Sequence, residues 1–147
     1  MPLKRVLFLC TGNSCRSQMA EGWLRHLAGD RFEVYSAGLE QHGLNPEAVA
    51  VMAEAGIDIS GHTSDAISRY ARTPMDFFIT VCDHAAETCP ITPPGSQTLH
   101  WSFQDPPRLV REAGLSGDEA RDVYRLVRDE IRQSVEAFAF PPEDAPE

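Results

Sequence analysis

The chain has 147 residues, of which 42% are hydrophobic and 24% charged, a composition ordinary for one globular domain with its own core. Its formal net charge of −9, from 13 basic and 22 acidic residues, argues against nucleic acid or an anionic membrane surface as a partner. The chain shows neither an N-terminal signal pattern nor a run of about eighteen apolar residues, so we expect a cytoplasmic protein.

The first elements predicted in chain order are a strand, a tight loop and a helix. Residues 6–9 (Val-Leu-Phe-Leu) form a short apolar run typical of a buried strand, and turn-forming residues 11–14 follow it. An amphipathic helix is predicted next, ended by Gly29, and its apolar stripe consists of Ala20, Trp23, Leu24 and Leu27. A strand, a tight loop and a helix start together aim backbone N–H groups at one point, a geometry that binds anions.

The next elements extend to residue 70. Residues 32–36 (Phe-Glu-Val-Tyr-Ser) alternate enough to predict a second strand. Residues 45–47 (Asn-Pro-Glu) supply the cap, the proline and the acid that open a helix, and Gly56 would end it. A short helix is then predicted from residue 64 or 65 toward Tyr70.

Two strands and a long loop are predicted in the middle of the chain. Residues 77–82 give the strongest strand signal and, like the first strand, lead into a cysteine. Residues 83–95 contain three prolines and form a loop long enough to be functional or mobile. Residues 97–101 predict a fourth strand, followed by a loop over 102–107.

The last predicted element is a long helix. Residues 116–119 (Ser-Gly-Asp-Glu) match a capping box. The apolar stripe of the helix that they open would consist of Val123, Leu126, Val127, Ile131, Val135 and Phe138. We expect one domain over residues 1–139 and a disordered acidic tail over residues 140–147.

The alternation of strands and helices predicts an α/β fold with a four-stranded parallel sheet and helices on both faces. In such sheets the active site lies beyond the carboxyl ends of the strands. Cys10, Cys82 and the loop holding Asp105 all follow predicted strands, so we expect them to meet at that edge. The chain has four cysteines, Cys10, Cys15, Cys82 and Cys89. In a reducing cytoplasm, cysteines are more often catalytic, redox-active or metal-binding than structural.

The loop of residues 10–17, CTGNSCRS, places Cys10 and Arg16 beside the predicted anion site. The loop dipoles and Arg16 would hold Cys10 as a thiolate, the nucleophilic form. Arg16 would grip two oxygens of a tetrahedral anion with its planar guanidinium group. Gly12 and Asn13 are able to take positive φ angles in such a loop. A cysteine that ends a core strand is usually just a small buried hydrophobe, so the rest of the chain must indicate a reaction.

Three features together identify a family: the loop CTGNSCRS, the segment CDHAAETC over residues 82–89, and Asp105 within WSFQDPP. With them the chain closely resembles the thioredoxin-coupled arsenate reductases, which are built on the low-molecular-weight protein tyrosine phosphatase fold. The likeness covers almost the whole chain, from CTGNSCRSQMAEGW through VYSAG and the HTSD segment to the final helix. This combination is far more specific than the C-x5-R pattern alone.

The resemblance implies reduction of arsenate to arsenite by a relay of three cysteines. Cys10 would attack arsenic and Asp105 would protonate the departing hydroxyl. Cys82 would then attack the sulfur of Cys10 to release arsenite, and Cys89 would move the disulfide to Cys82 and Cys89. Thioredoxin or a similar dithiol protein would restore the thiols of a monomeric enzyme. The residues that bind the oxyanion and stabilise the thiolate would be Thr11, Gly12, Asn13, Ser14, Cys15, Arg16 and Ser17.

The resemblance also suggests a potassium site, with no other tightly bound cofactor. Some family members hold potassium through four residues whose types are all present here, namely Asn13, Glu21, Ser36 and Asp65. Those residues could equally be ordinary hydrogen-bonding residues of the loops. Ser17 would hydrogen-bond the nucleophilic sulfur, and Cys15 is interpreted as a packing residue.

Two other functions remain open on the sequence. A phosphomonoester hydrolase would leave the pair Cys82 and Cys89 incidental, but residues 106–108 (Pro-Pro-Arg) stand where phosphatases of this fold usually carry aromatic residues. A thiol-based sensor would use that pair but would give Arg16 and Asp105 no role. Substitution of Asp105 by alanine discriminates, because a sensor would be indifferent whereas either enzyme would slow markedly.

Overall fold

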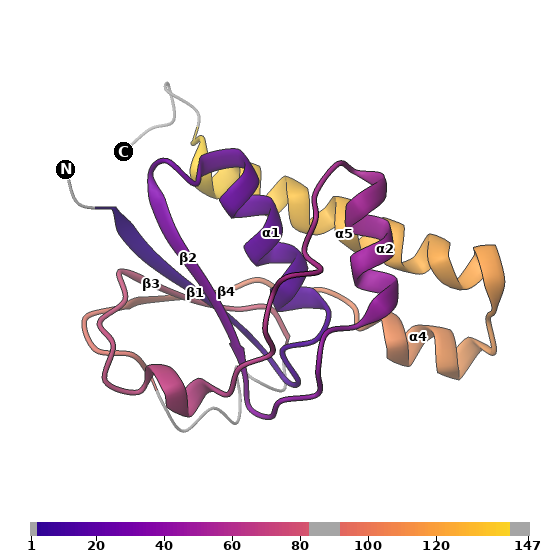
Figure 1. Ribbon diagram of the computed structural model, residues 1–147, viewed down its shortest axis with the longest axis horizontal. Helices are drawn as coiled ribbons and strands as arrows, with labels where there is room; N and C mark the ends of the chain where they lie inside the picture. Colours follow the sequence, from indigo (N-terminus) through magenta and orange to yellow (C-terminus); the bar gives the residue numbers. More distant parts are fainter. Residues whose placement is uncertain (1–2, 83–91, 142–147) are drawn as a thin grey trace.

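The computed structural model describes residues 3–82 and 92–141. One parallel sheet runs in the order β2-β1-β3-β4 (Figure 1), and its strands are β1 (Lys4–Cys10), β2 (Phe32–Gly38), β3 (Phe77–Thr80) and β4 (Gln97–His100). The helical elements are α1 (Arg16–Ala28), α2 (Pro46–Glu54), the 3-10 helix η1 (Ile67–Tyr70), α4 (Pro106–Ala113) and α5 (Gly117–Ala139). The predicted α/β fold with four parallel strands is confirmed.

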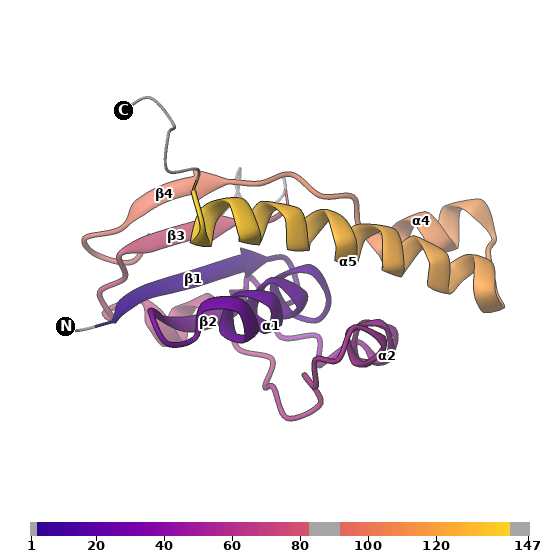
Figure 2. The same cartoon turned by 90° about the horizontal axis from the view of Figure 1, so that it is seen from above.

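Two long helices, α1 and α5, lie side by side on one face of the sheet (Figure 2). The indole N–H of Trp23 in α1 donates to the carbonyl of Arg128 in α5 at 3.2 Å. The ring of Phe138 ties α5 to the sheet, because its centroid lies 5.5 Å from Phe32 and 5.0 Å from Phe77. This face of the sheet is therefore sealed by helix and aromatic packing.

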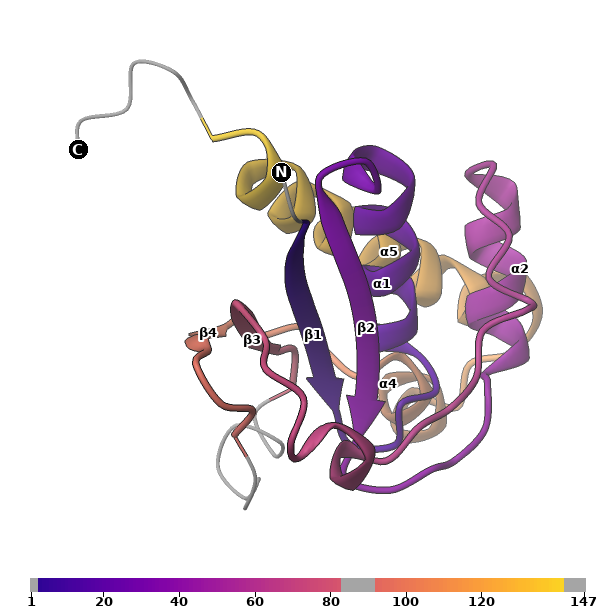
Figure 3. The same ribbon diagram turned by 60° about the vertical axis from the view of Figure 1, so that its left-hand side comes forward.

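The opposite face of the sheet is covered in part by η1 (Figure 3). The ring of Tyr70 in η1 lies 5.5 Å from the ring of Tyr35 in β2. Residues 6–9 of β1 are completely buried, which explains why that strand is a continuous apolar run instead of an alternating one.

The predicted start of α2 is confirmed, because the side chain of Asn45 accepts from the backbone N–H groups of Glu47 and Ala48. Gly56, which follows the helix, has a φ of 85°, a left-handed conformation that glycine adopts without strain. The third strand is shorter than predicted, since β3 ends at Thr80, two residues before Cys82.

The long helix α5 corrects two predictions. Ser116 occupies the N-cap position, but its side chain makes no capping hydrogen bond, and Gly117 follows with a φ of 55°. Leu126 is 57% exposed, whereas Tyr124 is buried. The buried stripe runs through Tyr124, Val127, Ile131 and Val135 at spacings of three and four, so Leu126 lies outside it.

Helix α4 was not predicted from the sequence. Two prolines at its start resembled a continuing loop, yet Pro106 and Pro107 occupy the first helical positions, where their missing N–H groups are not needed. Gly114 ends the helix in the left-handed conformation, with a φ of 63°. Residues 83–91 of the predicted loop and 142–147 of the predicted tail lie outside the described residues. Over the described ranges, no helix is long and apolar enough to cross a membrane.

Candidate active site

The loop between β1 and α1 surrounds the sulfur of Cys10 with hydroxyl and amide groups. Cys10 Sγ lies 2.9 Å from Ser17 Oγ, and the Ser17 hydroxyl donates to Asn13 Oδ1 at 2.8 Å. The Ser17 hydroxyl has one hydrogen, so it serves either Asn13 or a thiolate at Cys10. The three side chains form one buried chain of polar contacts at the carboxyl end of β1.

The two residues predicted to take positive φ angles behave differently. Asn13 has a φ of 48°, and its side-chain amide donates to the carbonyls of Ser36 at 3.3 Å and Asp65 at 3.4 Å. Gly12, although able to take a positive φ, does not have one. The imidazole ring of His42 packs against this glycine, since a Cβ atom there would lie 2.2 Å from Nδ1 of His42 and the ring would have to move.

The backbone carbonyls of the loop are held from outside by the chain that follows β2. The carbonyls of Cys10, Thr11, Gly12 and Ser14 accept hydrogen bonds, at 2.9 to 3.2 Å, from the backbone N–H groups of Leu39, Glu40, His42 and Asn45 respectively. In a trans peptide the N–H group points opposite to the carbonyl. Carbonyls held outward leave loop N–H groups free to face the centre, where an anion would bind.

Arg16 and Asp105 lie together, as predicted. Arg16 Nη1 donates to the carbonyl of Phe103 at 3.1 Å, and Nη2 lies 3.7 Å from Asp105 Oδ2. The Arg16 side chain is 11% exposed and that of Asp105 is 39% exposed. The segment after β4 therefore fixes the guanidinium group over the loop, while the carboxyl group stays accessible at the start of α4.

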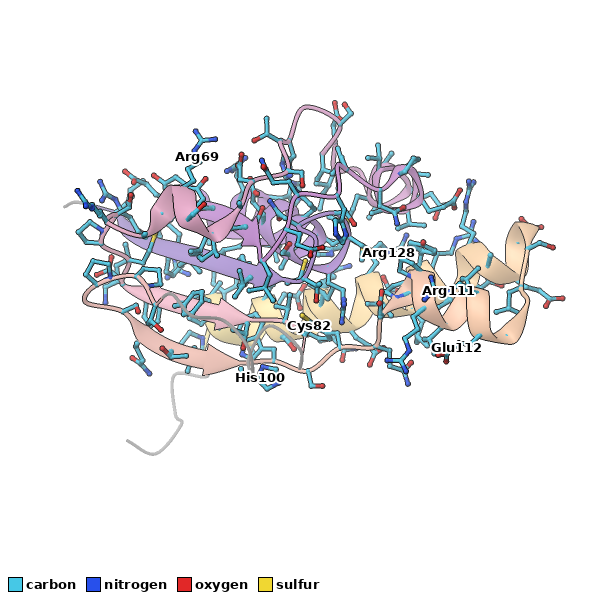
Figure 4. The ribbon with its side chains drawn as sticks, turned by 90° about the horizontal axis from the view of Figure 1, so that it is seen from below. Arg69, Cys82, His100, Arg111, Glu112 and Arg128 are labelled. Atoms are coloured by element: carbon cyan, nitrogen blue, oxygen red, sulfur yellow. The ribbon has the colours of Figure 1, made fainter. Side chains whose placement is uncertain are left out.

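Cys82 opens onto the same cavity, which has a volume of about 350 Å³ and is also lined by Thr11, Arg16, Phe103 and Asp105. Cys82 Sγ lies 3.3 Å from Thr11 Oγ1. The contact follows from the sheet register, because Leu9 pairs with Thr80, and two steps further along each strand bring Thr11 beside Cys82. Figure 4 shows Cys82 beyond the ends of the strands, on the side from which α4 with Glu112 extends.

The whole arrangement is a buried thiol at the start of a loop whose carbonyls are held outward, with an arginine, a carboxyl group and a second thiol around the neighbouring cavity. The model of the family described as low molecular weight phosphotyrosine protein phosphatase matches residues 5–144. The chain belongs to this family. The low-molecular-weight phosphatase fold that the resemblance implied is thereby confirmed.

Relatives within this phosphatase family carry the name arsenate reductase. The arsenate reductase of Halalkalibacterium halodurans is 50% identical over 139 residues, which cover 95% of this chain and 97% of the relative. A solved arsenate reductase in the phosphate binding state is 37% identical, with a TM-score of 0.74 over 93% of this chain and 97% of that one. The thioredoxin-dependent arsenate reductase of Corynebacterium glutamicum is 27% identical, with a TM-score of 0.62 over 93% of this chain and 64% of that one.

The thiols at this phosphatase-family site differ in their surroundings. Cys10, Cys15 and Cys82 are free and buried. Burial, aided by the neighbouring Cys10, raises the pKa of Cys15 far above its ordinary value, so Cys15 remains a neutral thiol at physiological pH. A thiol that stays protonated is a poor nucleophile, which agrees with a packing role. Cys89 lies outside the described residues.

The four residues predicted to hold potassium lie close together behind the loop. Ser36 Oγ donates to Glu21 Oε1 at 2.6 Å, and the Asn13 side chain reaches the carbonyls of Ser36 and Asp65. Glu21, Ser36 and Asp65 line one cavity of about 270 Å³. Both carboxylates already form a salt bridge with an arginine. Arg25 lies 2.7 Å from Glu21, and Arg69 lies 2.9 Å from Asp65.

The sequence did not reveal several contacts that build the site. The segment of residues 39–45 carries no motif, and its role as a support of the loop depends on backbone N–H groups that every sequence has. The Phe103 carbonyl that holds Arg16 is equally invisible in the sequence. The contact between Thr11 and Cys82 could have been deduced by extending the register of two neighbouring parallel strands.

Proposed function

We propose that this protein reduces arsenate to arsenite, with Cys10 as the nucleophile and Cys82 and Cys89 as the following members of a thiol relay. The observation that supports it best is the 3.3 Å contact between Cys82 Sγ and the hydroxyl of Thr11, the residue next to Cys10. Hydrolysis of a phosphate ester needs one thiol, whereas a two-electron reduction needs a second thiol within reach. The names of the relatives agree with this function.

Arsenate would bind as a tetrahedral oxyanion in the loop of residues 10–17. The inward N–H groups and the helix start would carry part of its charge, and Arg16 would hold two of its oxygens. Local dipoles must capture the anion because the net charge of the chain is −9. The Phe103 carbonyl that anchors Arg16 supports this role, since it fixes the guanidinium group before the anion arrives.

In the first step the Cys10 thiolate attacks arsenic and a sulfur–arsenic bond forms. One hydroxyl group leaves arsenic, and a proton from Asp105 converts it to water. Ser17 would turn its hydrogen toward the sulfur and stabilise the thiolate before the attack. The accessible carboxyl group of Asp105 at the mouth of the cavity supports its role as the acid.

In the second step the Cys82 thiolate attacks the sulfur of Cys10. A disulfide forms between the two residues, and the electron pair of the sulfur–arsenic bond passes to arsenic, which leaves as arsenite. Two thiols have then been oxidised and arsenic has been reduced from the pentavalent to the trivalent state. The Thr11 hydroxyl can donate to Cys82 and so stabilise its thiolate.

In the third step Cys89 attacks Cys82, which moves the disulfide to Cys82 and Cys89 and releases the Cys10 thiolate. An external dithiol protein then reduces this disulfide by exchange, and we propose a thioredoxin for this role. The relative from Corynebacterium glutamicum is named as thioredoxin-dependent, which supports that choice. We further propose that the protein works as a monomer in the cytoplasm, where such reductants keep thiols reduced.

We also propose that potassium binds beside Glu21 and Asp65. Hard carboxylate, carbonyl and hydroxyl oxygens gather there, and such donors suit a hard cation. The ion would share the two carboxylates with Arg25 and Arg69. Potassium chloride should therefore raise the thermal midpoint more than choline chloride of equal ionic strength, and Glu21→Gln should remove the difference. An equal midpoint in both salts would reject the site.

A weak phosphomonoesterase activity should accompany the reductase, because phosphate and arsenate have nearly the same shape. Cys10, Arg16 and Asp105 suffice for that reaction. Residues 106–108 open α4 with two prolines and an arginine, so they provide no aromatic platform for a phosphotyrosine ring. Side activity on a small aryl phosphate offers a direct assay of the loop that does not involve Cys82.

Steady-state turnover with arsenate, thioredoxin, thioredoxin reductase and NADPH tests the proposed function. Wild-type protein should oxidise NADPH in an arsenate-dependent manner, and Cys10→Ser, Cys82→Ser and Cys89→Ser should each abolish the signal. Cys82→Ser should retain aryl phosphatase activity, whereas Cys10→Ser should lose it. Cys15→Ser is the matched control for removal of a buried thiol and should keep turning over. Sustained turnover by Cys82→Ser would refute the relay.

A further inference from the structure

The carbonyl of Gly12, in the middle of the anion-binding loop, accepts two hydrogen bonds. One donor is the backbone N–H of His42 at 2.9 Å, and the other is the hydroxyl of Ser64 at 3.2 Å. The Ser64 oxygen itself accepts from the N–H of Gly43 at 3.3 Å. Because an amide N–H can only donate, the single hydroxyl hydrogen of Ser64 is left for the Gly12 carbonyl.

These contacts fix the plane of the peptide between Gly12 and Asn13. The carbonyl and the N–H of a trans peptide point in opposite directions, so the Asn13 N–H points away from Ser64. Gly38 packs against the same peptide, because a Cβ atom there would lie 2.6 Å from Asn13 N and 2.8 Å from Gly12 C. If this peptide turned over, a carbonyl oxygen would replace the N–H and would repel an oxyanion.

We propose that Ser64 is a positioning residue for the oxyanion site. Its hydroxyl holds the Gly12 carbonyl outward and thereby offers the Asn13 N–H to the bound anion. Ser64 acts through Gly12 and does not contact the substrate. The inference rests on the proposed function only for the identity of the natural anion, arsenate. Phosphate would use the same N–H group, so the role of Ser64 can be measured with phosphate alone.

Hydrogen bonds to its neighbours fix the backbone around Ser64. Its carbonyl accepts from the side chain of Gln41 at 2.9 Å. The next carbonyl along the chain, that of Asp65, accepts from the N–H of Gly38 at 2.8 Å, and Ala66 forms a bridge with Gly38. The hydroxyl is therefore held in place before the anion arrives, which lowers the entropy cost of binding.

Ser64→Ala removes the hydroxyl and leaves the backbone donor from His42. Loss of one neutral hydrogen bond should weaken binding of inorganic phosphate roughly 3- to 10-fold, measured by isothermal titration calorimetry. The KM for arsenate should rise by a similar factor while kcat stays within about twofold, because the N–H group binds ground state and transition state alike. Ser64→Thr keeps a hydroxyl and should bind phosphate within about twofold of wild type.

Ser60→Ala is the matched control, because the Ser60 hydroxyl bonds to Asp58 and not to the loop. Thermal melting of every variant shows whether the fold is intact. Wild-type affinity for phosphate in Ser64→Ala, or equal weakening in Ser64→Ala and Ser64→Thr, would overturn the proposal. Phosphate binding requires no electron transfer, so a failure of arsenate reduction in the wild type would reject the proposed function without touching the result for Ser64.

Discussion

Replacement of Arg16 by lysine tests whether the planar guanidinium group, and not just its positive charge, activates the oxyanion. Arg16 is nearly buried, with one nitrogen 3.1 Å from the Phe103 carbonyl and another 3.7 Å from Asp105. Lysine keeps the charge but gathers its donors on one atom, so it cannot hold the Phe103 carbonyl and two anion oxygens together.

The magnitude follows from the donors that are lost. Removal of one oxyanion donor costs about 10²- to 10³-fold in rate, and a hydrogen bond to a charged group contributes about 1.5–3 kcal/mol. We therefore expect kcat/KM for arsenate to fall about 10²-fold, or about 2.7 kcal/mol of transition-state stabilisation. The Phe103 carbonyl also loses its donor, which should lower the free energy of unfolding by about 1 kcal/mol and the midpoint by about 2–4 °C.

The assay measures kcat/KM for arsenate in the coupled system and for an aryl phosphate without reductant, because both reactions use the same loop. Arg108→Lys is the matched control, since Arg108 lines the same cavity but is paired with Glu112 at an exposed position. The control should stay within about twofold of wild type. Activity of Arg16→Lys within about fivefold of wild type on both substrates would refute the reasoning about the guanidinium fork.

Three further predictions address the relay, the loop and acid stability. Thr11→Val should slow arsenate turnover about 5- to 10-fold yet spare aryl phosphatase activity, because only the second step uses the contact with Cys82; equal loss in both assays would contradict this. Gly12→Ala should lower both activities and the urea midpoint, and combining it with His42→Gly should recover part of the lost stability because the colliding ring is gone; no recovery in the double variant would contradict this. Hydrogen bonding to Arg125 lowers the pKa of Glu54 to about 2, below its ordinary value of 4.5. The resulting stabilisation is complete above the ordinary pKa and is lost as the pH falls toward 2, so Glu54→Gln should reduce the pH dependence of the urea midpoint in that window, and an unchanged dependence would contradict it.

Elements whose signals are local could be predicted from the sequence. Asn45 caps α2 with its own side chain, and β1 is recognisable because both of its faces are buried. Cys82 and Asp105 line one cavity with Thr11, the residue after Cys10, as expected from the way parallel strands share a carboxyl end. The predicted strand ends therefore placed these motif residues at the edge of the sheet where the structure has them.

Features that depend on tertiary context could not be predicted. Leu126 fits a helical stripe on spacing alone, but in the structure it is 57% exposed, whereas Tyr124 is buried and its hydroxyl accepts from the side chain of Asn45 at 3.2 Å. Helix α4 begins with two prolines, which in sequence look the same as the end of a loop. The contribution of Ser64 depends on two loops that meet 52 residues apart in the chain, and no spacing rule brings them together.

The central claim is that electrons pass from thiols to arsenic in a fixed order. A single turnover without reductant tests it most directly, with arsenite quantified and disulfides located by mass mapping of peptides. Wild-type protein should yield one arsenite per chain and a Cys82–Cys89 disulfide, whereas Cys89→Ser should yield one arsenite and trap a Cys10–Cys82 disulfide. Arsenite released by Cys89→Ser without any Cys10–Cys82 disulfide would contradict the account.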